Sequence, residues 1–239
     1  MRLSERPGIL SMFEDMHSVS PVLERYTKQV LLGALWEGPE LSGRDRSLVA
    51  LTVMISRNQT AHMASYLDLA LDSGVSPDEI SEVIAHLAFY TGWANAMLAV
   101  AVTKVIFERR GITTDQLSPA TIDLLPVDAI AEEQRARAVV DKFGTTVPEL
   151  VQFTNDVLFA DVWRRPGLSL RDRSLITVCM VIATSQVTVL SYYLNRSMDS
   201  GLTRVEVSHI MTQLAFYSGW STVYSALPVV KDVFESRPN

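Results

Sequence analysis

The 239-residue sequence has one cysteine, few charged residues and no signature of a common cofactor site. A single cysteine, Cys179, forms no internal disulfide, CxxC redox centre or cysteine-based metal site, which excludes disulfide-rich secreted scaffolds. The four histidines are dispersed without acid-rich partners, so we expect no metal. No GxGxxG, P-loop, HExxH or GxSxG motif is present, and no cofactor is expected. The net charge of −6 argues against nucleic acid as a partner.

The two halves of the sequence repeat each other at a shift of 127 residues. LAFYTGW at 87–93 recurs as LAFYSGW at 214–220 without a gap. The same shift aligns LSGRDRSL with LSLRDRSL, LDSG with MDSG, KVIFE with KDVFE, Pro21 with Pro148, Thr27 with Thr154 and Trp36 with Trp163. We therefore predict two homologous units, residues 1–112 and 128–239. Residues 113–127, rich in threonine and proline, join them as a linker.

Apolar spacing and capping residues predict a helical fold in each unit. Short alternating runs bounded by tight hairpin turns are absent. Helix starts are indicated at Ser42 with Asp45, Ser169 with Asp172, Ser76 with Glu79, Thr203 with Glu206 and Thr146 with Glu149. The predicted helices cover about 6–17, 20–36, 42–57, 59–73 and 77–108, each repeated 127 residues later. Gly92 falls inside the last of these, where we expect close approach of another helix.

Two uncharged stretches, 174–195 and 210–230, are each long enough to span a bilayer. The first contains several hydroxyl and amide side chains, and its counterpart in the first unit carries Arg57, His62 and Asp68. We therefore predict two short buried helices interrupted near residue 185, and no membrane partner. The amino terminus has acids and a proline where a signal peptide needs an apolar run, so a cytoplasmic location is expected.

Two segments and their copies carry a resemblance to a known family: LSGRDRSLVALTVMISRNQ and LDLALDSGVSPDEISEVIAHLAFYTGW. In these segments the chain resembles the carboxymuconolactone decarboxylase / alkylhydroperoxidase D-like family, in tandem duplication. The resemblance covers nearly all of both units. It implies an all-α fold in which two alkylhydroperoxidase D-like helical units form a pseudo-dimer within one chain. Single units of this family assemble as dimers and hexamers, so a homotrimer that forms a pseudo-hexamer is expected.

The resemblance also indicates which helix carries the chemistry. The peroxidase branch has CxxC followed by His on the helix at about 59–73, where this sequence has no cysteine. Cys179 lies on the preceding helix of the second unit and is expected in the core. The decarboxylase branch typically has Glu-Leu-x-x-His, and this sequence has His62 in place of the Glu and Tyr66 in place of the His. The second unit has Val189 and Tyr193 there.

We therefore predict that the first unit is the active one and that the site of the second is degenerate. His62 and Tyr66, four residues apart on one helix face, are the candidate catalytic pair. The candidate substrate-binding residues are Arg57, Gln59, His86, Tyr90 and Trp93. The alternatives are an interface histidine with a packed tyrosine, a solvated Arg57, a buried Gln59 that bridges backbone groups, and an aromatic stripe that is part of the core.

The expected function is a cofactor-free lyase or isomerase. It would decarboxylate, isomerise or cyclise a small oxygenated or carboxylated molecule by acid–base catalysis, in secondary metabolism or aromatic degradation. One alternative is a non-catalytic ligand-binding or assembly protein of the same family. A peroxidase-like antioxidant is disfavoured because the CxxC motif is missing.

Overall fold

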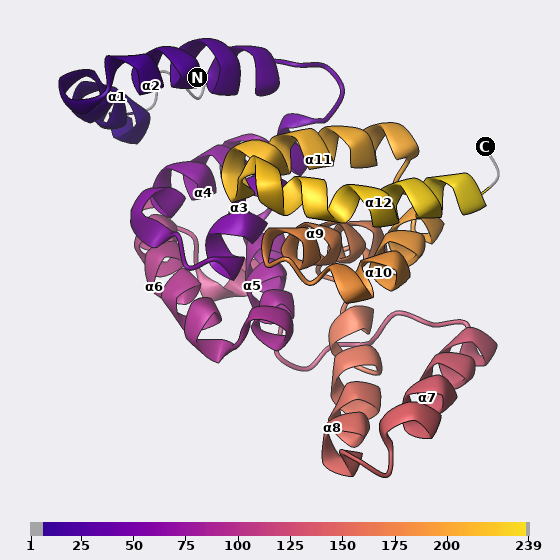
Figure 1. Cartoon of the computed structure of the whole chain (residues 1–239). Coiled ribbons are helices and arrows are strands. Elements are labelled where there is room, and N and C mark those ends of the chain that lie inside the picture. Colours follow the sequence, from indigo (N-terminus) through magenta and orange to yellow (C-terminus); the bar gives the residue numbers. More distant parts are fainter. Residues whose placement is uncertain (1–6, 238–239) are drawn as a thin grey trace.

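A computed structural model describes residues 7–237, which form helices and connecting loops without a β-strand (Figure 1). The first half contains α1 (Pro7–Val19), α2 (Pro21–Tyr26), η2 (Thr27–Leu35), α3 (Gly43–Ser56), η3 (Thr60–His62), α4 (Met63–Asp72), α5 (Pro77–Thr91), α6 (Trp93–Arg110) and the short turn η4 (Thr114–Gln116). The second contains α7 (Ala129–Phe143), α8 (Pro148–Phe153), η5 (Thr154–Phe159), η6 (Val162–Arg164), α9 (Leu170–Ala183), α10 (Val187–Asp199), α11 (Arg204–Ser218) and α12 (Trp220–Ser236). The predicted all-α class is confirmed.

Most of the predicted helix starts are present. The Ser42 hydroxyl accepts a hydrogen bond from the Asp45 backbone N–H at 3.0 Å, and Ser169 caps α9 in the same way. Reciprocal capping boxes begin α5 at Ser76 and α11 at Thr203. The start expected at Thr146 is wrong: Val147 precedes α8 and provides no side-chain cap. Pro148 begins that helix with its fixed backbone angle instead.

The expected long helix at 77–108 is broken at Gly92, and its copy is broken at Gly219. The backbone φ angle is 90° at Gly92 and 95° at Gly219, a region that favours glycine. A Cβ built at Gly92 has no heavy atom within 4 Å, so close helix approach does not explain this glycine. The sequence-based interpretation of Gly92 is therefore wrong: the glycine makes a corner, and α6 leaves in a new direction from Trp93.

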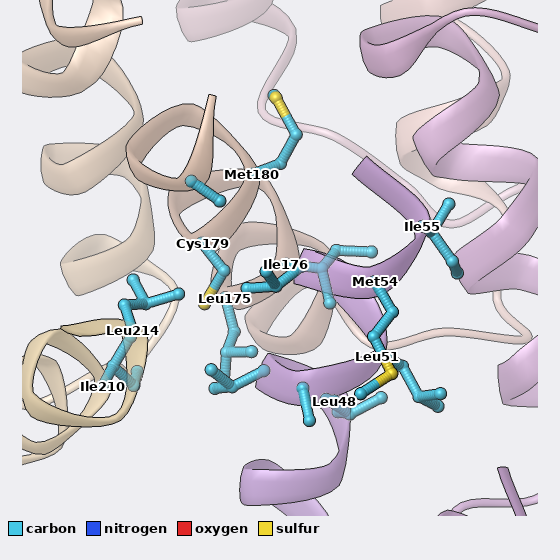
Figure 2. Close-up of a cluster of buried hydrophobic side chains, with 14 of the residues drawn as sticks. Leu48, Leu51, Met54, Ile55, Leu175, Ile176, Cys179, Met180, Ile210 and Leu214 are labelled. Atoms are coloured by element: carbon cyan, nitrogen blue, oxygen red, sulfur yellow. The ribbon is translucent and has the colours of Figure 1, made fainter. Parts of the chain in front are cut away.

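The core is built around α3 and α9, equivalent helices that pack against each other at the centre of the molecule (Figures 1 and 2). From Leu48 to Ile55 and from Leu175 to Ala183 every residue is buried, whichever way it faces. Figure 2 shows side chains of α3, α9 and α11 in contact there: Leu48, Leu51, Met54, Ile55, Leu175, Ile176, Cys179, Met180, Ile210 and Leu214. Burial on all sides explains why these segments contain so few charges.

Ion pairs at the start of the central helices join the two units. Arg44 of the first unit lies 2.7 Å from Asp172 of the second, and Arg171 of the second lies 2.9 Å from Asp45 of the first. This reciprocal exchange is what a pseudo-two-fold relation between the units requires. The units therefore pack as a pseudo-dimer within one chain.

The uncharged stretch 174–195 forms parts of two helices. The break near residue 185 is confirmed, since α9 ends at Ala183 and α10 begins at Val187, with Ser185 at a φ angle of 59°. Within residues 7–237, no helix has both the length and the apolar character needed to cross a membrane.

Candidate functional site: two tryptophan–tyrosine relays

A hydrogen-bonded relay of three aromatic side chains lies where the first unit meets α11. The indole N–H of Trp36 donates to the hydroxyl oxygen of Tyr217 over 2.9 Å. The Tyr217 hydroxyl in turn donates to the hydroxyl of Tyr66 on α4, at 3.0 Å. The rings of Tyr66 and Tyr217 meet edge to face, with centroids 5.8 Å apart. The relay ends at Tyr66, whose own O–H proton is left for a further acceptor.

The second relay has the same chemistry with the units exchanged. The indole N–H of Trp163 donates to the hydroxyl oxygen of Tyr90 on α5 over 2.8 Å. Tyr90 hydrogen-bonds Tyr193 on α10, and their rings meet edge to face with centroids 5.7 Å apart. Each relay therefore takes its tryptophan and terminal tyrosine from one unit and its central tyrosine from the other.

Burial keeps all four relay tyrosines protonated at neutral pH. Loss of water around the hydroxyls raises the pKa of Tyr90 and Tyr217 well above the ordinary value. Burial also raises the pKa of Tyr66 and Tyr193. The positive charge of Arg196 opposes the rise at Tyr90 and Tyr193, and that of Arg135 opposes it at Tyr193. The terminal tyrosines are thus proton donors in their resting state.

Next to Tyr90, His86 belongs to a buried charged network. Its ring stacks on Tyr90 with centroids 5.0 Å apart, and its Nε2 lies 2.8 Å from the Thr177 hydroxyl. Burial, together with the Arg173 and Arg196 guanidiniums, holds the pKa of His86 well below its ordinary value, so the ring is neutral. Arg173 is fully buried and donates to the Glu82 carboxylate at 2.7 Å. This network holds His86 in place against the Tyr90 ring of the second relay.

A cleft of about 540 Å³ lies beside the second relay, between α7 and α10. Trp163 forms part of its wall, and three arginines line it. The lining residues are Pro126, Val127, Asp128, Ala131, Glu132, Arg135, Phe159, Trp163, Arg164, Leu170, Tyr192, Asn195, Arg196, Asp199 and Ser200. The cleft brings positive charge and aromatic surface close to Tyr193.

The structure distributes the predicted residues over several places. Tyr66 ends the first relay, whereas His86 and Tyr90 belong to the second. The Trp93 side chain, 59% exposed, packs edge to face on Phe89 and lines an outer groove of about 620 Å³. Trp93 therefore lies apart from His86 and Tyr90. Two physical reasons are the corner at Gly92, which starts a new helix at Trp93, and the packing of α5 against the second unit.

The residues expected around His62 lie at the surface of the chain. His62 is exposed and ends the short turn η3 before α4 begins, whereas Tyr66 is buried one turn later. The pair therefore does not share a buried helix face, and the role of His62 in proton transfer stays a prediction. Gln59 is exposed, so the alternative of a buried bridging amide is wrong. Arg57 donates to the Ser218 carbonyl oxygen at 2.6 Å and so ties α3 to α11.

The described residues contain few side chains suited to redox or metal chemistry. Cys179 is fully buried, as expected of a core residue, and burial raises the pKa of its thiol. Between residues 7 and 237, no three His, Cys, Asp or Glu side chains converge into a metal site. The groups gathered around the two relays are the tyrosines, the neutral His86 and the arginines.

Sequence reasoning missed Trp36, Trp163, Tyr217 and the arginines of the cleft. A signal for the relays was present, because the shift of 127 residues aligns both tryptophans and both pairs of tyrosines. The sequence alone did not reveal that α5 of the first unit packs against the second unit, and that α11 of the second unit packs against the first. As a result, the hydrogen bond between Trp163 and Tyr90 joins residues that are 73 positions apart. The bond between Trp36 and Tyr217 joins residues that are 181 positions apart.

Comparisons with known proteins agree with the repeat. The model of the carboxymuconolactone decarboxylase family matches residues 21–105 and again residues 148–232. The 4-carboxymuconolactone decarboxylase of Acinetobacter baylyi is 23% identical over 105 residues, which cover 44% of this chain and 78% of that protein. The nitrosuccinic acid decarboxylase of Metarhizium robertsii is 31% identical over 72 residues, 30% of this chain and 50% of that protein.

A solved structure has the same fold over nearly the whole chain. It is a protein of Burkholderia xenovorans proposed to be a gamma-carboxymuconolactone decarboxylase subunit, with a TM-score of 0.53 and 16% sequence identity. The match covers 98% of this chain and 94% of that one, so it includes both helical units.

Proposed function

The chain belongs to the carboxymuconolactone decarboxylase family, and on that premise we propose that it is a lyase or isomerase acting on a small carboxylated molecule by proton transfer, without a cofactor. Two distant relatives named as decarboxylases support this class of reaction. The observation that carries the proposal is the pair of relays, each ending in a protonated tyrosine on the helix where the resembled decarboxylases have their histidine.

Tyr193 is the better placed of the two terminal tyrosines. Its side chain is half-buried, while Tyr66 is only 5% exposed. The guanidiniums of Arg196 and Arg135 are close enough to Tyr193 to act on its pKa. A positive charge beside a proton donor suits a substrate that arrives as an anion and leaves a carbanion or enolate behind. This assigns the chemistry to the second unit, opposite to the preference from sequence.

The reaction step balances without a co-reactant. In a decarboxylation, the bond between the carboxylate carbon and the adjacent carbon breaks and carbon dioxide leaves. The electron pair stays on that carbon and is delocalised onto a neighbouring carbonyl or nitro oxygen. Tyr193 then donates its proton to the carbon, and its phenolate, which accepts a hydrogen bond from Tyr90, is reprotonated from water.

The test is turnover of two carboxylated molecules named by the relatives, 4-carboxymuconolactone and nitrosuccinic acid. Release of ¹³C-labelled carbon dioxide and deuterium uptake from D₂O are followed by mass spectrometry and NMR. We expect Tyr193→Phe to lower kcat by about 100-fold or more, since loss of a general acid costs factors of this size. Tyr26→Phe is the matched control, because Tyr26 is 52% exposed on α2. Equal rates for Tyr193→Phe and the wild type would contradict the assignment.

The same assay tests the sequence-based hypothesis for His62. His62→Ala with unchanged turnover excludes this histidine as the acid or base. Saturable binding of both molecules without any turnover would instead favour the alternative, a non-catalytic ligand-binding protein of the same family.

A further inference from the structure

The cleft between α7 and α10 contains an arginine with no counter-ion. The guanidinium of Arg196 makes no hydrogen bond or ion pair with the described residues 7–237. It lies over the ring of Trp163, with its central carbon 4.2 Å from the ring centroid, and 5.5 Å from that of Phe159. An aromatic face stabilises a cation only partly and leaves the N–H donors at the guanidinium edge unused. Arg196 is therefore positioned to accept a ligand.

A second arginine of the cleft has an unused donor in a buried place. The Arg135 side chain is 8% exposed, and its Nη1 is buried without a hydrogen-bond partner. The other terminal nitrogen bonds Glu132 and Asn155. A buried N–H group without a partner is destabilising, so folded proteins rarely keep one without a reason. A ligand oxygen in the cleft would supply the missing partner.

The two guanidiniums share one ring. Arg135 lies 3.9 Å from the centroid of Phe159, the same ring that Arg196 approaches at 5.5 Å. Two like charges held near one ring in a half-buried setting repel each other. Arg164, the third arginine of the cleft, donates only to the carbonyl oxygens of Leu125 and Ala160. The lining also contains three carboxylates, those of Asp128, Glu132 and Asp199, so what matters is which of the charges already have partners.

The acidic residues of the cleft already have partners. The Asp128 carboxylate caps the first turn of α7, where it accepts from two backbone N–H groups. Glu132 pairs with Arg135, and Asp199 pairs with Arg237 at 2.6 Å. These carboxylates leave Arg164 and Arg196 without a negative partner.

The first unit lacks this arrangement. At the shift of 127 residues, the three arginines fall on Gly8, Glu37 and Leu69, and Phe159 falls on Leu32. Trp163 and Tyr193, in contrast, are matched by Trp36 and Tyr66. The relay is thus common to both units, while the arginine-lined cleft is specific to the second.

We propose that this cleft binds the carboxylate group of a planar aromatic or conjugated acid, with Arg196 and Arg135 as its principal ligands. The guanidiniums match a carboxylate, and the ring of Tyr192, which is 44% exposed in the cleft wall, offers a flat face for a planar body. This inference rests on the proposed function and names its substrate class. The guanidiniums of Arg196 and Arg135, which would hold the carboxylate, are the same two whose charges act on Tyr193.

The test uses 4-fluorobenzoate as the probe, with binding followed by ¹⁹F NMR at fixed ionic strength. We expect Arg196→Leu, which installs the residue of the first unit, to weaken binding at least tenfold. Arg137→Leu is the charge-matched control on α7, because Arg137 is exposed and pairs with Glu133. It should bind the probe within twofold of the wild type. Equal affinity of Arg196→Leu and the wild type would overturn the proposal.

Two measurements on the unmodified protein make the test independent of any folding defect. Neutral 4-fluorobenzamide should bind at least tenfold more weakly than the acid, and equal binding would contradict a carboxylate site. Inorganic phosphate should displace the probe only at higher concentration than benzoate does. Displacement at lower concentration would mean that the cleft is a phosphate site.

The outcomes separate this inference from the proposed reaction. Probe binding that depends on Arg196, without turnover of any carboxylated molecule, would support the carboxylate site in the cleft and contradict the proposed reaction. Turnover that is unchanged in Arg196→Leu would keep the reaction and reject the cleft.

Discussion

The indole nitrogen of Trp36 lies 2.9 Å from the hydroxyl oxygen of Tyr217, across 181 residues of sequence. Trp163 and Tyr90 make the equivalent contact at 2.8 Å, with the tryptophan now from the second unit and the tyrosine from the first. Each unit therefore completes a relay of the other, and neither relay exists within a single unit. The duplication has made both sites dependent on one intact chain.

Tyr217→Phe should lower the free energy of unfolding by about 1–3 kcal/mol. Removing the hydroxyl leaves the Trp36 N–H without an acceptor and Tyr66 without a donor, while the ring and its packing stay. Urea unfolding followed by circular dichroism measures the change. Tyr26→Phe, which removes an exposed hydroxyl on α2, should leave the curve unchanged. Equal midpoints for both variants would show that the relay adds no stability.

Glu82→Leu should destabilise the chain by about 3–5 kcal/mol. Glu82 is 3% exposed and neutralises Arg173, which is fully buried, so its loss leaves an uncompensated charge in the interior. Glu108→Leu is the control, since Glu108 pairs with Lys104 on an exposed surface.

The double variant Glu82→Leu with Arg173→Leu makes this prediction sharper. Because it removes both charges, it should recover much of the stability lost in the single variant. A double variant less stable than Glu82→Leu alone would show that the cost comes from packing and not from the buried charge.

The sequence predicted what depends on local patterns. The repeat, the caps at Ser42 and Ser76, the break near Ser185 and the burial of Cys179 follow from spacing, side-chain chemistry and self-comparison, and all are present. Gly92 shows the limit of such reasoning. A glycine within a helical pattern is compatible with close packing or with a corner, and only its positive φ angle distinguishes the two.

The candidate site depended on contacts that no local pattern contains. Tyr66, His86 and Tyr90 were found because they share helical spacing and family positions, but their partners come from the other unit. Arg196 looks in sequence like an ordinary surface residue of α10. Its significance comes from the ring of Trp163, which lies 33 positions away in the chain and 4.2 Å away in space.

We expect three chains to associate, as the family resemblance implies. Two grooves at equivalent positions, one beside Trp93 and one beside Trp220, expose apolar surface on each chain. The side chains of Trp220 and Tyr224, which line the same groove, are 54% and 64% exposed, and contiguous apolar surface is typical of interaction sites. Light scattering after size exclusion should give about three times the 26.6 kDa of one chain.

Trp220→Asp should lower that mass, because a carboxylate in an apolar interface is left desolvated and unpaired. Arg137→Ala on α7 is the control, since Arg137 is 73% exposed and lines neither groove. A wild-type mass equal to one chain would contradict the expected assembly.

His86 should make the stability of the chain depend on pH below about 6.5. Its pKa is held well below the ordinary value in the folded state, so the folded ring stays neutral while the unfolded ring takes up a proton. Stability is therefore fully present above the unfolded pKa and falls as the pH decreases below it, by up to about 1.4 kcal/mol per pH unit. His86→Gln, which installs the residue found at the equivalent Gln213, should have a shallower slope between about pH 6.5 and 5. Urea unfolding at several pH values measures both slopes, and only their difference matters because the substitution also changes the absolute stability. Parallel slopes would mean that His86 is protonated in the folded chain, in conflict with its burial beside Arg173.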